Sequence, residues 1–197
     1  TDGARMEGSL TDDRSSGDPV SRLPAADMLR DHALWCETGG VEGKPSVFDS
    51  VDLRSLKSIR GLNLTALSAR GAIFYGLDME GVQMQGAHLE GADLRACSLR
   101  GADLRGARLA GARLNGADLR QAQFGPLLLS ADRILPADLT GAILRGADLS
   151  GADLRNGRLT GADLSRARLH GCQMRLTDLS GAVLTGALGL NSEGIPA

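Results

Sequence analysis

The sequence predicts a solenoid, in which short units of one pattern wind into coils that stack on one another. Between positions 64 and 184, 25 residues stand five apart; 18 of them are leucine, and only Ala69 is not large and apolar. The residue two places earlier is nearly always alanine, and glycine recurs three places earlier. A spacing of five fits neither the helical period nor the alternation of a strand, so the repeat itself decides the fold class.

An extended backbone explains the residue pattern of each five-residue unit. The large apolar residue and the alanine two places before it then point to one side, while the polar residues beside them point to the other. Glycine permits a sharp turn once in every unit. Such units bury their apolar atoms only by winding and stacking, which places Leu104, Leu144 and Leu164 in the core.

The repeating unit is visible as a word in the sequence. GADLR stands at 91–95, 101–105, 116–120 and 151–155, and GADLS stands at 146–150 and 161–165. The chain therefore resembles the pentapeptide-repeat proteins, whose consensus is A(D/N)LXX, over roughly two-thirds of its length. The resemblance implies an all-β fold, a right-handed quadrilateral β-helix with four units per coil, and about six coils for residues 61–185. It implies no particular activity, because a fold does not determine a function.

The pattern divides the chain into four regions. These are a polar, acidic tail at 1–20, a capping helix and linker at 21–45, the β-helix at 46–190, and a second tail at 191–197. In the lead-in, Phe48, Leu53 and Ile59 are spaced by five and then six, so one residue is inserted before the regular spacing begins. We expect the coil to start near Phe48 and to contain a bulge there.

A helix is expected between Pro24 and Thr38, because the double glycine that follows is a stop signal and apolar residues recur at helical spacing. The apolar stripe consists of Met28, Leu29, His32, Trp35 and Cys36. A solenoid exposes the apolar end of its first coil and needs a cap. We predict that this helix covers that end, with Met28, Leu29 and a buried Trp35 against the coil.

Residues 125–136, GPLLLSADRILP, interrupt the repeat. Pro126 and Pro136 bracket the segment, the corner glycines disappear, and Asp132 falls at an inward position. Because an unpaired buried carboxylate is costly, we expect the segment to leave the coil as a loop or small hairpin. Its role is either structural only or contact with a partner, since loops on rigid scaffolds often carry function.

The sequence contains no pattern typical of a catalytic, cofactor-binding or metal-binding site. His32, His88 and His170 are too far apart along the coil to share a metal or relay a proton, and the glycines do not match a phosphate loop. Cys97 and Cys172 take the inward alanine position, where we expect buried, unreactive thiols. We therefore expect no enzyme activity, no cofactor and no metal.

The charge of the coil bears on the kind of partner. Residues 61–190 contain 14 arginines, no lysine and 12 acidic residues, so the coil is slightly basic although the whole chain carries −2. The best-known functional branch of the resembled family mimics B-DNA and protects or inhibits type II topoisomerases such as DNA gyrase. That role requires a strongly negative surface. The charge therefore argues against DNA mimicry, which stays the alternative function.

If every coil took twenty residues, five arginines would form a stripe along one face of the rod. They are Arg95, Arg113, Arg133, Arg155 and Arg175. We expect this stripe to dock an acidic surface of a protein partner; the alternative is a mixed, solubilising surface. If residues 126–135 leave the coil entirely, the later units shift by two faces and the stripe splits. Nucleic-acid binding is not expected, because the coil lacks lysine and a set of stacking aromatic side chains.

The function predicted from the sequence is that of a rigid, non-enzymatic interaction module with an unidentified protein partner. The C-terminal end contains Leu188, Leu190 and Ile195 but no capping helix, so an end-to-end homodimer through the open final coil is a further expectation. No apolar run is long enough to span a membrane, and residues 1–20 lack the features of a signal peptide. A cytoplasmic location is therefore expected.

Overall fold

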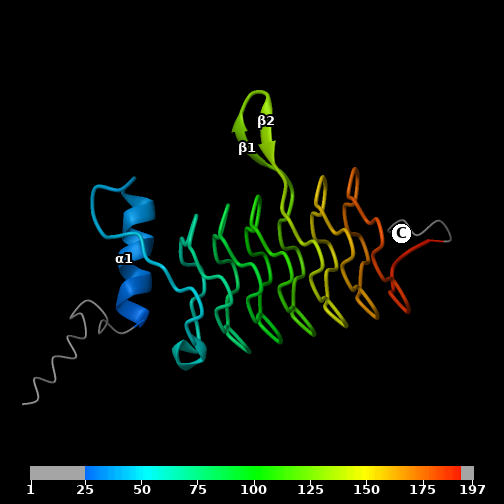
Figure 1. Cartoon of the computed structure of the whole chain (residues 1–197), viewed down its shortest axis with the longest axis horizontal. Helices are drawn as coiled ribbons and strands as arrows, with labels where there is room; N and C mark the ends of the chain where they lie inside the picture. The colour runs from blue at the N-terminus through cyan, green and yellow to red at the C-terminus, as the bar shows by residue number, and fades with distance from the viewer. Residues whose placement is uncertain (1–24, 192–197) are drawn as a thin grey trace, which may run out of the picture.

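The computed structural model describes residues 25–191, which form a rod of stacked coils with a helix at its N-terminal end (Figure 1). The regular elements are helix α1 at Ala25–Glu37, the short 3-10 helix η2 at Arg54–Leu56, and strands β1 at Leu127–Ser130 and β2 at Arg133–Leu135. The rest of the rod is held by single parallel bridges between coils. The tail expected at 1–20 lies outside the described residues, and so do residues 21–24. Of the tail expected at 191–197, only Asn191 is described.

Parallel bridges fix the number of units in each coil. Gln83 bridges Asp103, and Asp103 bridges Gln123, so stacked residues lie 20 apart, which is four units. The bridges arrange the outward residues in four columns, and each column runs along one face of the rod. The Asp103 face comprises Asn63, Gln83, Asp103, Gln123, Asp153 and Gln173, and the Asp93 face comprises Asp52, Ile73, Asp93, Arg113, Ile143, Asp163 and Val183.

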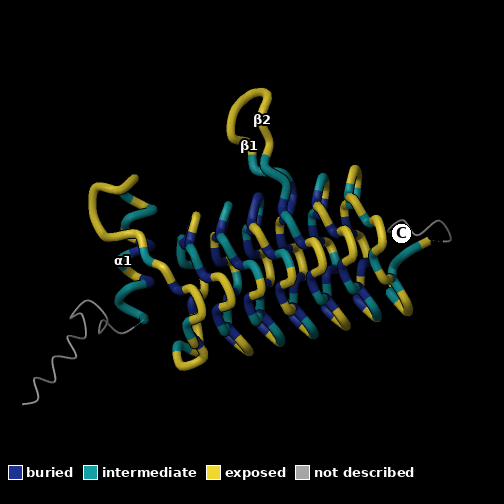
Figure 2. Tube along the Cα trace, viewed as in Figure 1, coloured by how far each residue is buried: buried dark blue, intermediate teal, exposed yellow. Residues whose placement is uncertain are grey.

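The inward residues form one continuous core along the rod, seen as dark blue segments in Figure 2. Leu104, Leu144 and Leu164 have no exposed surface, which confirms their predicted place in the core. Between coils, the amide of Leu104 donates to the carbonyl of Gln123 at 2.7 Å, and this pattern recurs in successive coils. The core therefore grows with each coil, and backbone hydrogen bonds satisfy the polar groups that the winding buries.

The corners between units use left-handed backbone. Most corner residues are glycine, but six corners of the regular coil carry a side chain at a φ of 55° to 62°. These six are Ala66, Ala96, Gln121, Asn156, Arg166 and Leu176. Asparagine tolerates this conformation, whereas a bulky residue such as leucine adopts it at a cost. Leu176, with a φ of 62°, is therefore the unusual corner.

The lead-in contains the predicted extra residue. Val47 bridges Ser68 and Asp52 bridges Ile73, each 21 residues apart, whereas Ser58 bridges Asp78 at the regular spacing. The additional residue is taken up by η2 and by Lys57, whose φ is 60°. Phe48 is buried at the start of the coil, so the predicted beginning near Phe48 is confirmed.

Helix α1 packs against the first coil. Leu29 is buried and joins the core, and His32 is buried beside it. The His32 ring bridges two backbone groups: Nε2 lies 3.1 Å from the Thr65 carbonyl, and Nδ1 lies 3.1 Å from the Ser46 amide. Because the Ser46 N–H can only donate, Nδ1 accepts and Nε2 carries the proton. The helix thus closes the N-terminal end of the rod through both apolar and polar contacts.

The prediction that Trp35 is buried against the coil is wrong. Trp35 is half-buried, and its Nε1 stands against the turn at Gly40, where an added Cβ would lie 3.2 Å away. The face of α1 that meets the coil is instead centred on Leu29, His32 and Ala33. Met28 is partly buried and packs against the core. The side of the helix that faces the coil therefore includes Ala33 and not Trp35, and the Trp35 ring covers the turn after the helix.

Candidate protein-binding site

Strands β1 and β2 form an antiparallel hairpin that projects from the side of the rod (Figure 1). Leu127 pairs with Leu135, and Leu128 pairs with Ile134. Gln123 bridges Asp153, 30 residues away, so the hairpin removes ten residues from the coil while the stacking continues beneath it. Asp132 lies exposed at the tip, and its carboxylate therefore stays in solvent.

The two ends of the hairpin have different surroundings. At its base, Leu127 and Leu135 lean on the corner at Gly106, where an added Cβ would lie 3.0 Å from each side chain. Further out, Leu128, Leu129 and Ile134 are exposed, and Leu128 keeps 73% of its surface in solvent. The outer hairpin is the bright exposed loop in Figure 2. Its apolar side chains are not used by the fold.

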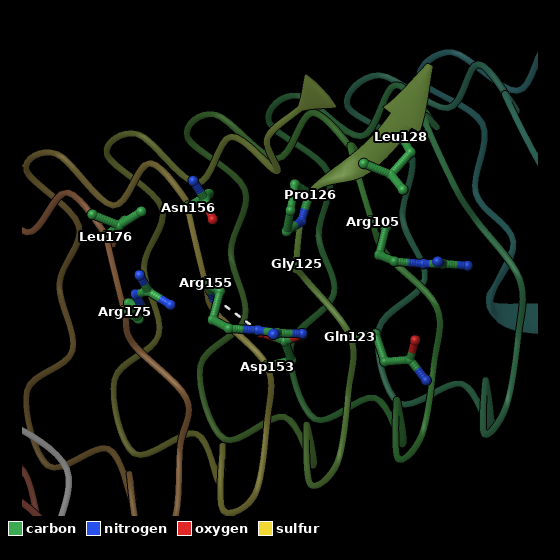
Figure 3. Close-up of a pocket in the computed structure, with 10 residues that line it drawn as sticks. All are labelled: Arg105, Gln123, Gly125, Pro126, Leu128, Asp153, Arg155, Asn156, Arg175 and Leu176. Atoms are coloured by element: carbon green, nitrogen blue, oxygen red, sulfur yellow. Dashed lines mark hydrogen bonds and ion pairs between the residues drawn. The ribbon is translucent and has the colours of Figure 1, made fainter. Parts of the chain in front are cut away.

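A cleft of about 480 Å³ lies between the hairpin and the Asp103 face (Figure 3). Leu128 and Pro126 line it from the hairpin side, and Leu176 lines it from the corner of a later coil. Arg105, Arg155 and Arg175 contribute guanidinium groups from three different coils. The stacking register brings these arginines together, because each follows a residue of the same column by two positions.

Two of the three arginines are neutralised within their own unit. Arg155 donates from Nε to Asp153 at 2.9 Å and from Nη2 at 2.7 Å, and its amide donates to the same carboxylate at 3.0 Å. Arg105 binds Asp103 in the same way. Five units carry this pair: Asp52–Arg54, Asp93–Arg95, Asp103–Arg105, Asp118–Arg120 and Asp153–Arg155.

These pairs alter the titration of the aspartates. The hydrogen bond from the arginine side chain lowers the pKa of Asp93, Asp118 and Asp153, and lowers the pKa of Asp52 to about 2. The pair was not predicted from the sequence, although the word GADLR contains its signal. An outward aspartate and an outward arginine two residues apart point to the same side of an extended unit.

Arg175 differs from Arg105 and Arg155. Its unit has Gln173 in place of the aspartate, and its side chain makes no ion pair or hydrogen bond among residues 25–191. Its carbonyl accepts the Asn156 amide at 3.1 Å, which holds the backbone of this corner in place. The cleft therefore contains one guanidinium whose charge has no partner within the described chain.

The structure offers little for catalysis or metal binding. Within residues 25–191, no group of three or more His, Cys, Asp and Glu side chains is arranged to hold a metal ion. Cys97 and Cys172 are buried, as predicted, and burial raises the pKa of each thiol to about 11. Each donates its S–H to a backbone carbonyl, of Phe74 and Leu149 respectively.

Of the helices in residues 25–191, none is long and apolar enough to cross a bilayer.

The comparison with protein families decides the identity of the repeat. The model described as pentapeptide repeats matches eight copies, at residues 87–124, 137–171 and 162–187. The gap between the first two matches coincides with the hairpin segment. The chain belongs to the pentapeptide-repeat family. Members of this family are repeat scaffolds that are generally non-catalytic and fold as a right-handed β-helix.

Several solved pentapeptide-repeat structures are similar to this chain. Rfr23 from the cyanobacterium Cyanothece 51142 is 23% identical over 69% of this chain and 93% of its own, with a TM-score of 0.47. HetL of Nostoc sp. strain PCC 7120, involved in heterocyst differentiation regulation, is 31% identical over 75% and 67%, with a TM-score of 0.27. A trypsin-treated variant of QnrB1, a plasmid-mediated fluoroquinolone resistance protein, is 20% identical over 70% of each chain, with a TM-score of 0.43. No curated protein sequence matches this chain.

The structure of this pentapeptide-repeat protein does not bring the five predicted arginines into one stripe. Arg95 and Arg113 lie on the Asp93 face, Arg155 and Arg175 lie on the Asp103 face, and Arg133 lies on β2. The reason is that the hairpin adds ten residues, so a count of twenty no longer returns to the same face. In addition, Arg95 and Arg155 are paired with Asp93 and Asp153.

Proposed function

We propose that this pentapeptide-repeat protein is a non-enzymatic interaction scaffold, a rigid rod of about six coils that presents the β1–β2 hairpin to a protein partner. One observation carries the proposal. In a chain that buries a leucine at almost every coil position, Leu128, Leu129 and Ile134 stand exposed together on a projecting hairpin.

The exposed hairpin residues have no use in folding. Leu127 and Leu135 already attach the hairpin to Gly106, and the coil stacks without the segment. Clustered exposed apolar side chains on a soluble domain mark interaction sites, and loops held by a rigid scaffold commonly provide them. Because the rod is braced by backbone hydrogen bonds from coil to coil, the partner meets a surface that changes little on binding.

The test compares partner capture by the full chain and by a variant without the hairpin. Residues 126–136 are replaced by a single glycine, which restores the 20-residue spacing of the bridges. Glycine is required because the corner has positive φ, which proline cannot adopt. We expect affinity capture from native-host extract to recover a specific protein with the full chain and to lose it with this variant.

A finer variant separates side chains from hairpin shape. Changing Leu128, Leu129 and Ile134 to serine keeps the backbone pairing and removes the apolar surface, so capture should again be lost. Val41→Ser is the control, because Val41 is also an exposed apolar residue but lies after α1, away from the hairpin. A chain beginning at Ser46 tests the helical end separately. Undiminished capture by the hairpin variants would reject the proposal.

Regulation or protection of a type II topoisomerase is the alternative function. The GADLR units do not favour it, because the arginine of each of the four units neutralises the aspartate of the same unit. These aspartates are Asp93, Asp103, Asp118 and Asp153. A DNA mimic needs a continuous negative surface. Inhibition of a supercoiling reaction by the purified chain would establish the alternative despite this charge argument.

Two further features belong to the proposal. The last described coil leaves Val183 and Leu188 exposed, and we expect a second copy to pair there. A strictly monomeric mass by light scattering at high concentration would remove the homodimer. We also expect the protein to act in the cytoplasm, which fractionation of the native host would check.

A further inference from the structure

We infer that the cleft beside the hairpin binds an extended, acidic segment of the partner, with apolar side chains on both sides of its carboxylates. The inference rests on the proposed function and names the chemistry of the partner that the scaffold recognises. It depends on three features of the cleft: a strained and exposed leucine, an unpaired arginine, and a length that crosses several coils.

The first feature is Leu176. This residue occupies a corner at φ 62°, where glycine fits without strain, and 71% of its surface is exposed. The backbone conformation is unfavourable for a bulky residue such as leucine, so folding does not explain its presence at this corner. Strain of this kind is retained where a site requires it. Leu176 lines one end of the cleft, and Leu128 lines the end beside Arg105 (Figure 3).

The second feature is the charge between the two leucines. Arg175 has no acidic partner among the described residues, whereas Arg155 and Arg105 each use Nε and Nη2 on their aspartates. A guanidinium has five N–H donors, so Nη1 of each paired arginine still offers hydrogen bonds. Three arginines therefore line one cleft, and the charge of Arg175 has no acidic partner among the described residues. Carboxylates are the acceptors that such donors bind most strongly in a protein partner.

The third feature is the direction of the cleft. Its arginines follow Asp103, Asp153 and Gln173, which belong to one bridged column with Gln123 between the first two. Four successive coils at about 4.8 Å span about 14 Å, which corresponds to about four residues of extended chain. An elongated site with apolar ends and cationic groups between them fits a short extended peptide. A compact anion would reach the arginines but leave both leucines unused.

The experiment selects ligands without assuming a sequence. The full-length protein is immobilised and a phage-displayed library of random twelve-residue peptides is panned against it. We expect enriched peptides to contain Asp or Glu flanked by Leu, Ile, Val or Phe at a separation of about four residues. Enrichment of peptides without acidic residues, or of none above background, would overturn the inference.

Variants then place the enriched peptide in the cleft. Arg175→Ser and Leu176→Gly should each weaken its binding by about tenfold or more, measured by fluorescence anisotropy with the synthetic peptide. Leu176→Gly should at the same time raise the thermal unfolding midpoint, because glycine relieves the corner. A loss of binding in a more stable protein cannot result from misfolding.

Matched controls lie elsewhere on the rod. Arg166→Gly relieves another non-glycine corner, at φ 60°, and Arg113→Ser removes an arginine without an ion pair from the Asp93 face. Neither should change peptide affinity by more than about twofold. Equal weakening by the controls would show that general charge, not the cleft, attracts the peptide.

Other occupants give distinct results. Tighter peptide binding after removal of residues 1–24 would assign the cleft to that acidic segment of the same chain, and a dimer that Leu176→Gly dissociates would assign it to a second copy. Either result would overturn the inference. If partner capture requires the hairpin but is unaffected by Arg175→Ser and Leu176→Gly, the cleft assignment fails while the proposed function stands.

Discussion

The coil and the hairpin use the same residue for opposite purposes. Leu104 in the coil is completely buried, whereas Leu128 in the hairpin has 73% of its surface exposed, although the two lie in neighbouring parts of the rod. Each coil leucine is enclosed because the units before and after it continue the winding. The hairpin leaves the coil, so its leucines lose those neighbours. The comparison shows that burial here is decided by position in the winding and not by the residue itself.

The comparison predicts the largest effect for the coil. Leu104→Ala removes buried methyl groups and leaves a cavity, so we expect the free energy of unfolding to fall by about 3 kcal/mol. Denaturant unfolding followed by circular dichroism measures it. A change below 1 kcal/mol, roughly, would mean that the stacked coils collapse around the missing side chain and that the core is not tightly packed.

The helical end should be the next most sensitive region. His32→Ala leaves the Thr65 carbonyl and the Ser46 amide without their side-chain partner, and we expect a loss of about 2 kcal/mol. The half-buried ring of Trp35, 5.8 Å from His32, reports release of the helix through its fluorescence. Unchanged stability would show that the apolar contacts of Leu29 alone hold α1.

The same histidine should make this end sensitive to acid. Burial lowers the pKa of His32 below its usual 6.5, so the unfolded chain takes up the proton first as pH falls. The stabilisation is therefore complete above about pH 7 and declines progressively below 6.5. His32→Gln, which cannot charge, should lack the change in unfolding free energy between pH 7 and 5. The same pH dependence in the glutamine variant would assign it to other groups.

Smaller effects are expected for the aspartate–arginine pairs. Asp118→Ala removes both the ion pair and the acceptor for the Arg120 amide, whereas Arg120→Ala removes the ion pair alone. We expect a loss of about 1 kcal/mol for the aspartate and a smaller loss for the exposed arginine. High salt should weaken the arginine effect more strongly in proportion, because the ion-pair part of both losses is screened and the amide contact of Asp118 is not. Equal losses would mean that the amide contact contributes nothing.

The smallest effect on stability should come from the hairpin. Leu128→Ser changes an exposed side chain, so the free energy of unfolding should stay within about 0.5 kcal/mol of the wild type. The thermal unfolding midpoints of Leu128→Ser and Leu104→Ala, measured side by side, compare the smallest expected loss of stability with the largest. A substantial destabilisation by Leu128→Ser would show that the outer hairpin belongs to the folding unit.

The repeat was sufficient to predict the parts of the molecule that depend on local geometry. The five-residue spacing places Leu104, Leu144 and Leu164 in the core, and the family that it indicates is shown by the matched repeats. The site depended on a longer distance. Arg155 and Arg175 come to the Asp103 face only because the hairpin segment adds ten residues outside the coil. The shift by two faces was foreseen as one of two outcomes, because the sequence alone does not show whether such a segment leaves the coil entirely. Trp35 was misplaced because one position along a helix rotates a side chain by about 100°, which is enough to move it from the coil to the loop.

The length of the hairpin also has a consequence for how such a rod can change. The interior repeats every five residues, but the exterior repeats only every twenty. An insertion of any multiple of five residues therefore keeps the later apolar residues pointing inward, and unless it is also a multiple of twenty it moves every later exterior residue to another face. The ten extra residues inserted between Gln123 and Asp138 move the downstream exterior residues by two of the four faces and leave the stacking intact. In this architecture, the pattern shown to partners can be rearranged by changing chain length alone, without altering one core residue.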